Sequence, residues 1–310
     1  MTLHGHDHAH HHSHAHAPRH GHGRAFLIGI VLNVLFVAFE YSFGVMAHSL
    51  ALLADATHNL GDVLSLIIAW GASVLAQRRP TERFTYGLRG SSILAALANA
   101  VLLLLVTGGL ALEAIERFNT PQQVAGDVVI AVAACGVVVN GITAWLFMAG
   151  SKHDLNIRGA YLHMLADAAV SLGVVAAGII VIYTGWQWLD PLVTLLLVVV
   201  IVWSTWGLLR DAVHLALQAV PGSIEAAEVR AFLAAQPGVK EVHDLHIWGM
   251  STTEHALTVH LVCPCGHPGD AFLYGLARDI EARFGIGHVT IQVELADAGG
   301  ACALAPEHVV

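Results

Sequence analysis

Charged side chains are scarce in this sequence. They make up 12% of its 310 residues, whereas a soluble domain carries about 25%. Two segments, 128–149 and 191–209, contain none at all. The formal net charge is -9, so the chain has no basic footprint for binding nucleic acid. Combined with a hydrophobic content of 56%, this deficit predicts that most of the chain lies in a lipid bilayer.

Cysteine is also scarce, and two familiar signals are missing. Of the four cysteines, Cys135 lies in an apolar run, and the set does not resemble a disulfide framework. The first 23 residues are His-rich and lack the Lys/Arg cluster and apolar core of a signal peptide, so we expect none. The motif His-Glu-x-x-His is absent, which argues against a membrane metalloenzyme.

Apolar runs of helix length are abundant. A helix needs about 20 apolar residues to cross the hydrocarbon core of a bilayer. Polar or turn-forming segments, such as Arg78-Arg79-Pro80, separate the runs from one another. We therefore predict six transmembrane helices, at 26–46, 50–76, 91–115, 128–149, 159–183 and 190–209.

Lys and Arg residues in the short loops predict the orientation of these helices. Such residues accumulate on the cytoplasmic side of a membrane. The opposite loops contain only Arg117, so we expect both termini to face the cytoplasm, with the protein in the cell (inner) membrane. The residues on the predicted cytoplasmic side are Arg19, Arg24, Arg78, Arg79, Arg83, Arg89, Lys152, Arg158 and Arg210.

The chain after Arg210 has the residue pattern of an ordinary soluble domain. Segments 223–236 and 268–284 have the pattern of amphipathic helices, and three further segments alternate like strands. The order α-β-β-α-β predicts a small two-layer α+β domain. The predicted divisions are a His-rich arm at 1–24, a transmembrane domain at 25–210, a cytoplasmic domain at 211–296 and a flexible tail at 297–310. The expected strands are 239–249, 255–263 and 288–294.

Two predicted spans contain the same pair of ionisable residues. His58 is followed by Asp62, and His163 by Asp167, four residues later in each case. Residues four apart share one face of a helix, and each charge in a span costs roughly 2.5–3.5 kcal/mol on insertion scales. One such pair could be a buried hydrogen bond, but two copies at similar depth favour a metal site. Two nitrogens and two oxygens suit tetrahedral Zn²⁺.

Two interpretations stay open for each of the other polar residues in the spans. Asp55 could line an aqueous path or serve a structural role. The remaining ones could form hydrogen bonds between helices; they are Asn33, Glu40, Asn99 and Asn140.

Several segments together carry a family resemblance. They are Asn33…Glu40…Gly44 with the run Ser49–His58 and Asp62, then Tyr86-Gly87-Leu88-Arg89, His163…Asp167, Val242–Trp248 and His288–Glu294. In this combination and order they resemble the cation diffusion facilitator family, and its zinc-transporting branch in particular, over roughly residues 24–295.

This resemblance implies a homodimeric exporter with six spans per protomer and a cytoplasmic metallochaperone-like domain. The implied transport site consists of His58, Asp62, His163 and Asp167. The sequence departs from the family after the second span, where Gly90 stands in place of a spacer leading to an acidic residue. We therefore expect no metal site in that loop.

The resemblance also implies a second metal site in the C-terminal domain. Its candidate ligands for Zn²⁺ are His243, His260 and Glu294, with His246 and His288 as additions.

Two further groups of residues could bind metal. Cys263, Cys265 and His267 form a compact cluster whose ligand types suit zinc or copper(I), although a plain turn is the alternative. The His-rich arm lacks the apolar residues needed to fold, and such tracts bind metals weakly. Its histidines are His4, His6, His8, His10, His11, His12, His14, His16, His20 and His22.

Together these features predict a secondary active transporter rather than an enzyme. We expect efflux of Zn²⁺, with Cd²⁺ and Co²⁺ as alternative substrates, in exchange for protons, because protons and metal compete for the same ligands. The competing interpretation is a non-transporting membrane metal sensor or a partner subunit. Retention of all four ligands in the membrane argues against it, and metal flux in sealed vesicles distinguishes the two.

Overall fold

The computed structural model describes residues 23–76, 78–148, 155–295, 302 and 304. Most of the predicted arm, Lys152 in the loop between the fourth and fifth helices, and most of the predicted tail lie outside these residues. The chain forms two compact units. One comprises the residues up to 69 together with 101–205, and the other comprises 70–100 together with the residues from 206 onward.

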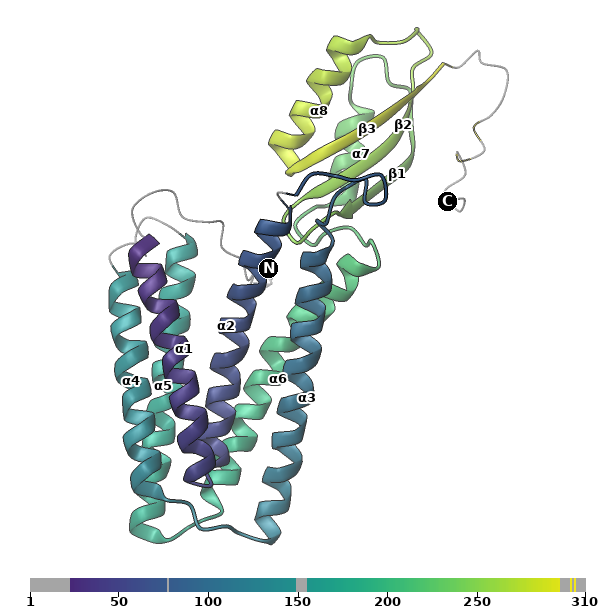
Figure 1. Cartoon of the computed structure of the whole chain (residues 1–310). Helices are drawn as coiled ribbons and strands as arrows, with labels where there is room; N and C mark the ends of the chain where they lie inside the picture. The colour runs from purple at the N-terminus through teal and green to yellow at the C-terminus, as the bar shows by residue number, and fades with distance from the viewer. Residues whose placement is uncertain (1–22, 77, 149–154, 296–301, 303, 305–310) are drawn as a thin grey trace, which may run out of the picture. The chain divides into compact units, whose positions relative to one another are not determined.

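Six long helices occupy the positions of the six predicted spans (Figure 1). Within the described residues, four segments are long and apolar enough to cross a membrane: α3, α4, Tyr161–Thr184 of α5, and α6. Within the described part of α1, Asn33–Met46 is apolar. Helix α2 carries the ionisable pair His58 and Asp62. The helices are α1 (Gly23–Met46), α2 (Leu50–Ala76), α3 (Ser91–Asn119), α4 (Gly126–Met148), α5 (Leu155–Thr184) and α6 (Leu189–Ala216).

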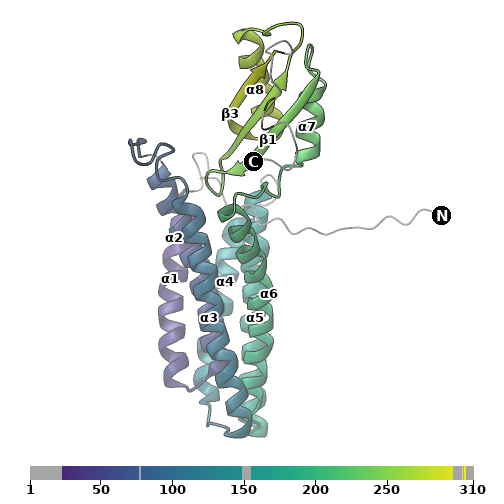
Figure 2. The same cartoon turned by 90° about the vertical axis from the view of Figure 1, so that its right-hand side faces the viewer.

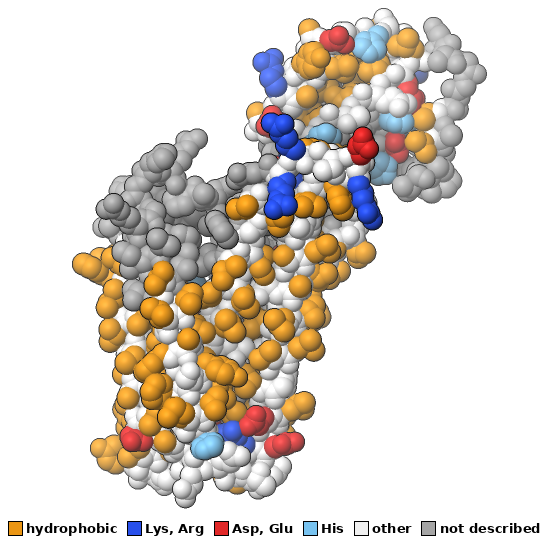
Figure 3. Space-filling model, viewed as in Figure 1, with side chains coloured by type: hydrophobic (Ala, Val, Ile, Leu, Met, Phe, Trp, Pro, Cys, Tyr) orange, Lys and Arg blue, Asp and Glu red, His pale blue; other side chains and the backbone are white. Residues whose placement is uncertain are grey.

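Hydrophobic side chains cover the visible face of these helices (Figure 3). Many are large and project outward; Leu105, for example, is 69% exposed and Trp203 is 78% exposed. A soluble protein rarely leaves a contiguous surface of this kind in water. The surface therefore fits a multi-pass membrane protein whose helices face lipid.

Helices α4 and α5 pack closely because small residues lie where they meet. A Cβ atom on Gly126 would lie 2.8 Å from Cγ1 of Ile182, and one on Gly178 would lie 2.9 Å from Cγ1 of Ile130. Small residues allow helix backbones to approach each other in lipid, where packing rather than hydrophobicity drives association. Both views show the two helices side by side (Figures 1 and 2).

Asp190, at the start of α6, holds the first turn of α2. Its Oδ2 accepts a hydrogen bond from the Leu50 backbone at 2.8 Å, and its Oδ1 accepts one from Ser49 Oγ at 2.6 Å. A carboxylate at this position satisfies free N–H groups and interacts favourably with the helix dipole. This contact fixes the end of the helix that carries half of the candidate site.

The C-terminal domain has the predicted order α-β-β-α-β. Its sheet runs β1-β2-β3, with β1 and β2 antiparallel and β2 and β3 parallel. Both helices contribute to one apolar core, and Phe232 of α7 contacts Phe284 of α8 edge to face. The elements are α7 (Ala226–Ala234), β1 (Glu241–Gly249), β2 (His255–Val262), α8 (Asp270–Phe284) and β3 (Ile286–Glu294).

One irregularity interrupts this sheet. The register between β1 and β2 shifts between His243 and His246, and Asp244 there has a φ of 49°. A bulge of this kind re-aims the side chains beside it. The sequence pattern predicted the strand, but it did not predict the bulge.

Candidate metal centres

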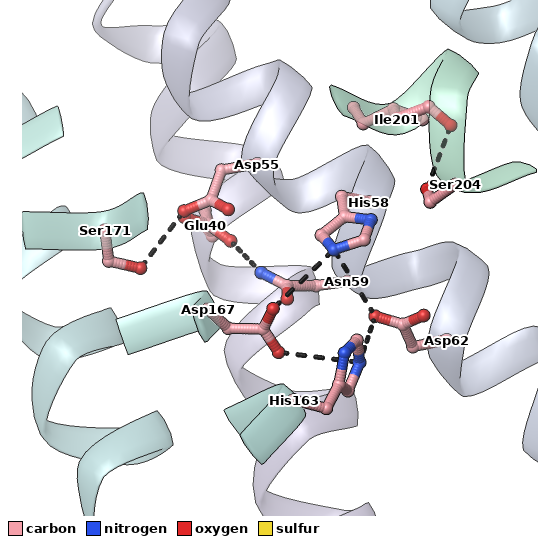
Figure 4. Close-up of polar contacts among 10 residues, drawn as sticks. All are labelled: Glu40, Asp55, His58, Asn59, Asp62, His163, Asp167, Ser171, Ile201 and Ser204. Atoms are coloured by element: carbon pink, nitrogen blue, oxygen red, sulfur yellow. Dashed lines mark hydrogen bonds and ion pairs between the residues drawn. The ribbon is translucent and has the colours of Figure 1, made fainter. Parts of the chain in front are cut away.

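Helices α2 and α5 bring His58, Asp62, His163 and Asp167 together (Figure 4). On each helix the two residues lie one turn apart, so both side chains project from the same face. Figure 4 shows the two imidazoles and two carboxylates pointing toward a shared point between the helices. The convergence expected from the sequence is thus present in the structure.

The distances among these side chains suit a shared ion. Asp62 Oδ2 lies 3.1 Å from His163 Nε2 and 3.9 Å from His58 Nε2. The two carboxylate oxygens of Asp167 each lie 3.6 Å from one of the imidazole nitrogens. A tetrahedral Zn²⁺ with bonds of about 2.0–2.2 Å holds its ligand atoms about 3.3–3.6 Å apart. Small side-chain shifts would therefore satisfy that geometry.

The four residues are not equivalent in position. Asp62, His163 and Asp167 form a tight group whose ligand atoms all lie within 4.8 Å of one another, and His58 lies outside this group. The ring centroids of His58 and His163 are 6.0 Å apart. His58 still faces both carboxylates, so it lies where a fourth ligand could approach.

The side chains of this site differ in how much of their surface is exposed. The side chain of Asp167 is 3% exposed, whereas those of Asp62 and His163 are 37% and 42% exposed. Asp167 Oδ2 is buried and has no hydrogen-bond partner among the residues that the structure describes. A buried carboxylate oxygen is normally satisfied by a donor or a cation. The group is thus partly exposed at Asp62 and His163 and buried at Asp167.

A second polar group lies beside the four residues. Asn59 donates a hydrogen bond to Glu40 Oε2 at 3.2 Å, and Ser171 donates one to Asp55 Oδ2 at 3.2 Å. Glu40 therefore bonds across helices, as one reading of the sequence allowed, and Asp55 is bonded and 1% exposed. Sequence reasoning does not single out Ser171, because a hydroxyl in a span is common.

For Asn140, the sequence left a hydrogen bond between helices open as one of two interpretations. It is fully buried in α4, and neither side-chain polar atom has a hydrogen-bond partner in the described part of the chain. The hydrogen bond between helices that the sequence suggested for Asn140 is therefore not observed.

His243, His260 and Glu294 also lie together, on the sheet of the C-terminal domain. His243 and His260 are paired in register on β1 and β2, and Glu294 is at the end of β3. Glu294 Oε1 lies 2.9 Å from His260 Nδ1, and Oε2 lies 3.4 Å from His243 Nε2. Burial acts to raise the pKa of Glu294, but a hydrogen bond with Cys302 and the nearby imidazoles lower it.

Sequence reasoning missed one member of this group. Cys302, which falls in the predicted tail, places Sγ 3.6 Å from His260 Nδ1. The ligand atoms of His243, His260, Glu294 and Cys302 all lie within 4.8 Å of one another. Cys302 follows His260 by 42 residues, and no periodic pattern links the two positions.

The two additional histidines point elsewhere. His246 Nε2 lies 2.8 Å from Asp244 Oδ1, and the His288 ring contacts Tyr86 edge to face at 5.4 Å. Among the described residues, neither belongs to a group that could hold a metal ion.

The cluster of Cys263, Cys265 and His267 does not converge either. Cys263 is 2% exposed and lies in the apolar core, where burial raises the pKa of its thiol. Cys265 is exposed, and His267 Nδ1 accepts a hydrogen bond from the Gly269 backbone. Within the described residues these three do not form a group that could hold a metal, so the turn is the better interpretation.

Comparison with known proteins gives matches over nearly the whole chain. Residues 26–215 match the cation efflux transmembrane domain family, and residues 221–296 match the cation efflux protein, cytoplasmic domain family.

Three curated relatives illustrate these matches. The "Cadmium, cobalt and zinc/H(+)-K(+) antiporter" of Bacillus subtilis is 34% identical, with 87% of this chain and 88% of the relative covered. The "Metal cation efflux system protein CzcD" of Cupriavidus metallidurans is 38% identical, with coverage of 88% and 87%. The "Zinc transporter ZitB" of Escherichia coli is 37% identical, with coverage of 84% and 83%.

One solved structure also matches. It is the metal-bound C-terminal domain of the CzcD transporter from Cupriavidus metallidurans, which is 42% identical and has a TM-score of 0.22. The match covers 23% of this chain and all of the domain.

Proposed function

This chain belongs to the cation efflux family, and we propose that it exports Zn²⁺ from the cytoplasm across the inner membrane in exchange for protons. Its family makes it a divalent metal transporter rather than an enzyme. The substrate class also includes Cd²⁺ and Co²⁺, both of which appear in the name of the Bacillus subtilis relative.

The observation that carries this proposal is the convergence of two imidazoles and two carboxylates from α2 and α5. This ligand set suits Zn²⁺, because nitrogen ligands favour it over harder cations such as Mg²⁺ and Mn²⁺. Four protein ligands also leave no coordination position for a substrate that would be chemically converted. In our proposal His58, Asp62, His163 and Asp167 bind the transported ion.

Proton exchange follows from the chemistry of the ligands. Imidazole nitrogens and carboxylates bind metal only when they are deprotonated, so Zn²⁺ and protons exclude each other at this site. With the site open to the cytoplasm, Zn²⁺ displaces protons. With the site open to the outside, protons displace Zn²⁺. Movement of the helices around a fixed site would exchange access between the two sides.

The C-terminal domain is proposed to be cytoplasmic and to bind metal separately. Arginines such as Arg78 and Arg89 lie between α2 and α3, on the side that the loop charges assign to the cytoplasm. His243, His260 and Glu294 are the proposed ligands there, with Zn²⁺ as the resident ion. We also propose that the protein is a homodimer that pairs through this domain.

Zinc flux into sealed vesicles tests the transport proposal. Purified protein would be reconstituted with an internal zinc dye and an internal pH dye, and an imposed pH gradient would drive exchange. We expect zinc movement with opposite proton movement, at a rate that rises with the gradient. Zinc binding without flux would support the competing interpretation, a non-transporting sensor or partner subunit.

A further inference from the structure

We propose that Cys302 is the fourth ligand of the metal site in the C-terminal domain, and that it closes that site around a thiophilic divalent cation. This proposal adds a ligand to the C-terminal metal site proposed above. It rests on the proposed function only for the cytoplasmic location of the domain. It assigns a metal ligand to the segment after β3, which the sequence predicts to be a flexible tail. The other three ligands are His243, His260 and Glu294.

The spacing of the ligand atoms supports four-fold coordination. In a tetrahedral zinc site, a thiolate sulfur lies about 3.5–3.6 Å from a neighbouring imidazole nitrogen, and a carboxylate oxygen lies about 3.3–3.5 Å from one. Cys302 Sγ is 3.6 Å from His260 Nδ1, and Glu294 Oε2 is 3.4 Å from His243 Nε2. Both distances match the edges of such a tetrahedron.

His243 gives an independent indication of a ligand. It is 6% exposed, and neither ring nitrogen has a hydrogen-bond partner in the described part of the chain. Leaving a buried polar group without a partner costs about 1–3 kcal/mol. Its Nε2 lies 3.4 Å from Glu294 Oε2 and forms no hydrogen bond with it. A cation between His243 and Glu294 would satisfy both.

Asp244 orients the second imidazole. Its Oδ2 lies 3.4 Å from His260 Nε2, so the N–H at Nε2 can point toward Asp244 and the lone pair of Nδ1 toward Cys302 and Glu294. A ligating histidine usually donates its other N–H to a carboxylate in this way. The bulge at Asp244, where φ is 49°, gives the carboxylate this position. Asp244 is thus a positioning residue rather than a ligand.

The thiolate determines which ions the site would select. Three ligands alone would leave one position of a zinc ion open. Closing that position with sulfur favours Zn²⁺, Cd²⁺ and Co²⁺ over Mn²⁺ and Mg²⁺. Binding replaces the S–H bond of Cys302 with a sulfur–metal bond and releases one proton to solvent.

Cobalt spectroscopy tests this proposal on the full-length protein. Co²⁺ bound by thiolate gives a ligand-to-metal charge-transfer band in the near ultraviolet, whereas imidazole and carboxylate ligands do not. The transport site has no sulfur ligand, so the band reports the C-terminal domain. We expect the band in the wild type and in Cys265→Ala, whose thiol is exposed in the same domain, and we expect its loss in Cys302→Ala.

Zinc affinity gives the second measurement. Competition against Co²⁺ should show at least a 10-fold weakening in Cys302→Ala and a loss of about 10–100-fold in Asp244→Asn, with the band retained in the latter. Asn tolerates a positive φ, so Asp244→Asn keeps the bulge while removing the charge. No band in the wild type, an equal band in Cys302→Ala, or loss of the band in Cys265→Ala would overturn the proposal. Zinc flux in vesicles of the same wild-type preparation decides the transport proposal separately.

Discussion

Asp167 is the most shielded side chain of the proposed transport site, with 3% exposure. Within the described parts of the chain, one of its carboxylate oxygens has no hydrogen bond. Replacement by Ala removes a charge that is costly in lipid, so the span should still insert and fold. Without this ligand, zinc flux should fall to the level of protein-free vesicles. Asp211→Ala is the matched control, because Asp211 is exposed and its ion pair is with neighbouring Arg210. Flux near the wild-type rate in Asp167→Ala would refute the site.

His58 contributes one of the two nitrogens and lies outside the tight group of the other three. Replacing it with Asp changes the ligand set to one nitrogen and three oxygens, which suits harder ions. In vesicles that contain dyes for both metals, we expect the ratio of Mn²⁺ to Zn²⁺ flux to rise at least 10-fold. His48→Asp serves as the control, since His48 is exposed and has a φ of 54° that Asp tolerates. An unchanged ratio in His58→Asp would remove His58 from the ligand set.

A site residue can be predicted from the sequence when the other ligands of its site lie close to it along the chain. His58 with Asp62, and His163 with Asp167, are one helical turn apart, so helix geometry alone aligns each pair. Cys302 is different, because it follows His260 by 42 residues and no local pattern links the two positions. Cys263 was one candidate ligand beside Cys265, but it follows the end of β2 and its side chain lies in the apolar core.

At the scale of single elements, the close packing of α4 against α5 gives a direct prediction. A Cβ atom on Gly178 would lie 2.9 Å from Ile130 Cγ1 and 3.4 Å from the Gly126 carbonyl oxygen, whereas one on Gly173 of the same helix would have nothing within 4 Å. Gly178→Ala should therefore separate the helices and cost about 1–3 kcal/mol. Gly173→Ala should be neutral. Thermal unfolding in detergent measures both, and equal melting temperatures would contradict this packing.

The elements themselves follow closely from the sequence pattern. All six long helices and the three strands occur where hydropathy and alternation placed them, because lipid leaves the backbone no alternative to a helix. One feature escaped prediction. The register shift at Asp244 depends on pairing with β2, which no local pattern in β1 shows.

At the scale of the whole molecule, the His-rich arm should assist transport without being part of the path. Its composition lacks the apolar residues that would fix one geometry, and the four proposed transport ligands all lie within α2 and α5. Removing residues 1–23 should raise the zinc concentration for half-maximal flux by a few-fold at most, with an unchanged maximal rate. Complete loss of flux in the truncated protein would show that the arm is essential.

Two chains should pair through the C-terminal domain. A domain of this size has a small core, which here is built from residues between Ile224 and Ile286, and pairing would bury further apolar surface. Light scattering of the purified protein in detergent should give the mass of a homodimer. Deleting the chain from residue 211 onward should shift that mass toward the monomer. A truncated protein that remains fully dimeric would assign the interface to the long helices instead.

Metal in the C-terminal domain should also change how the two domains approach each other. An ion held by His243 and His260 would neutralise part of the negative charge contributed by Glu241, Asp244 and Glu294, all of which lie near these imidazoles. Two such domains would then repel each other less, so zinc should favour the membrane state in which they lie closer. X-ray scattering of the domain from residue 211 onward should show a smaller radius of gyration with zinc. His243→Ala with His260→Ala should abolish the change, whereas His255→Ala with His267→Ala should retain it. Equal compaction in both double variants would remove this regulatory role while leaving the transport site untouched.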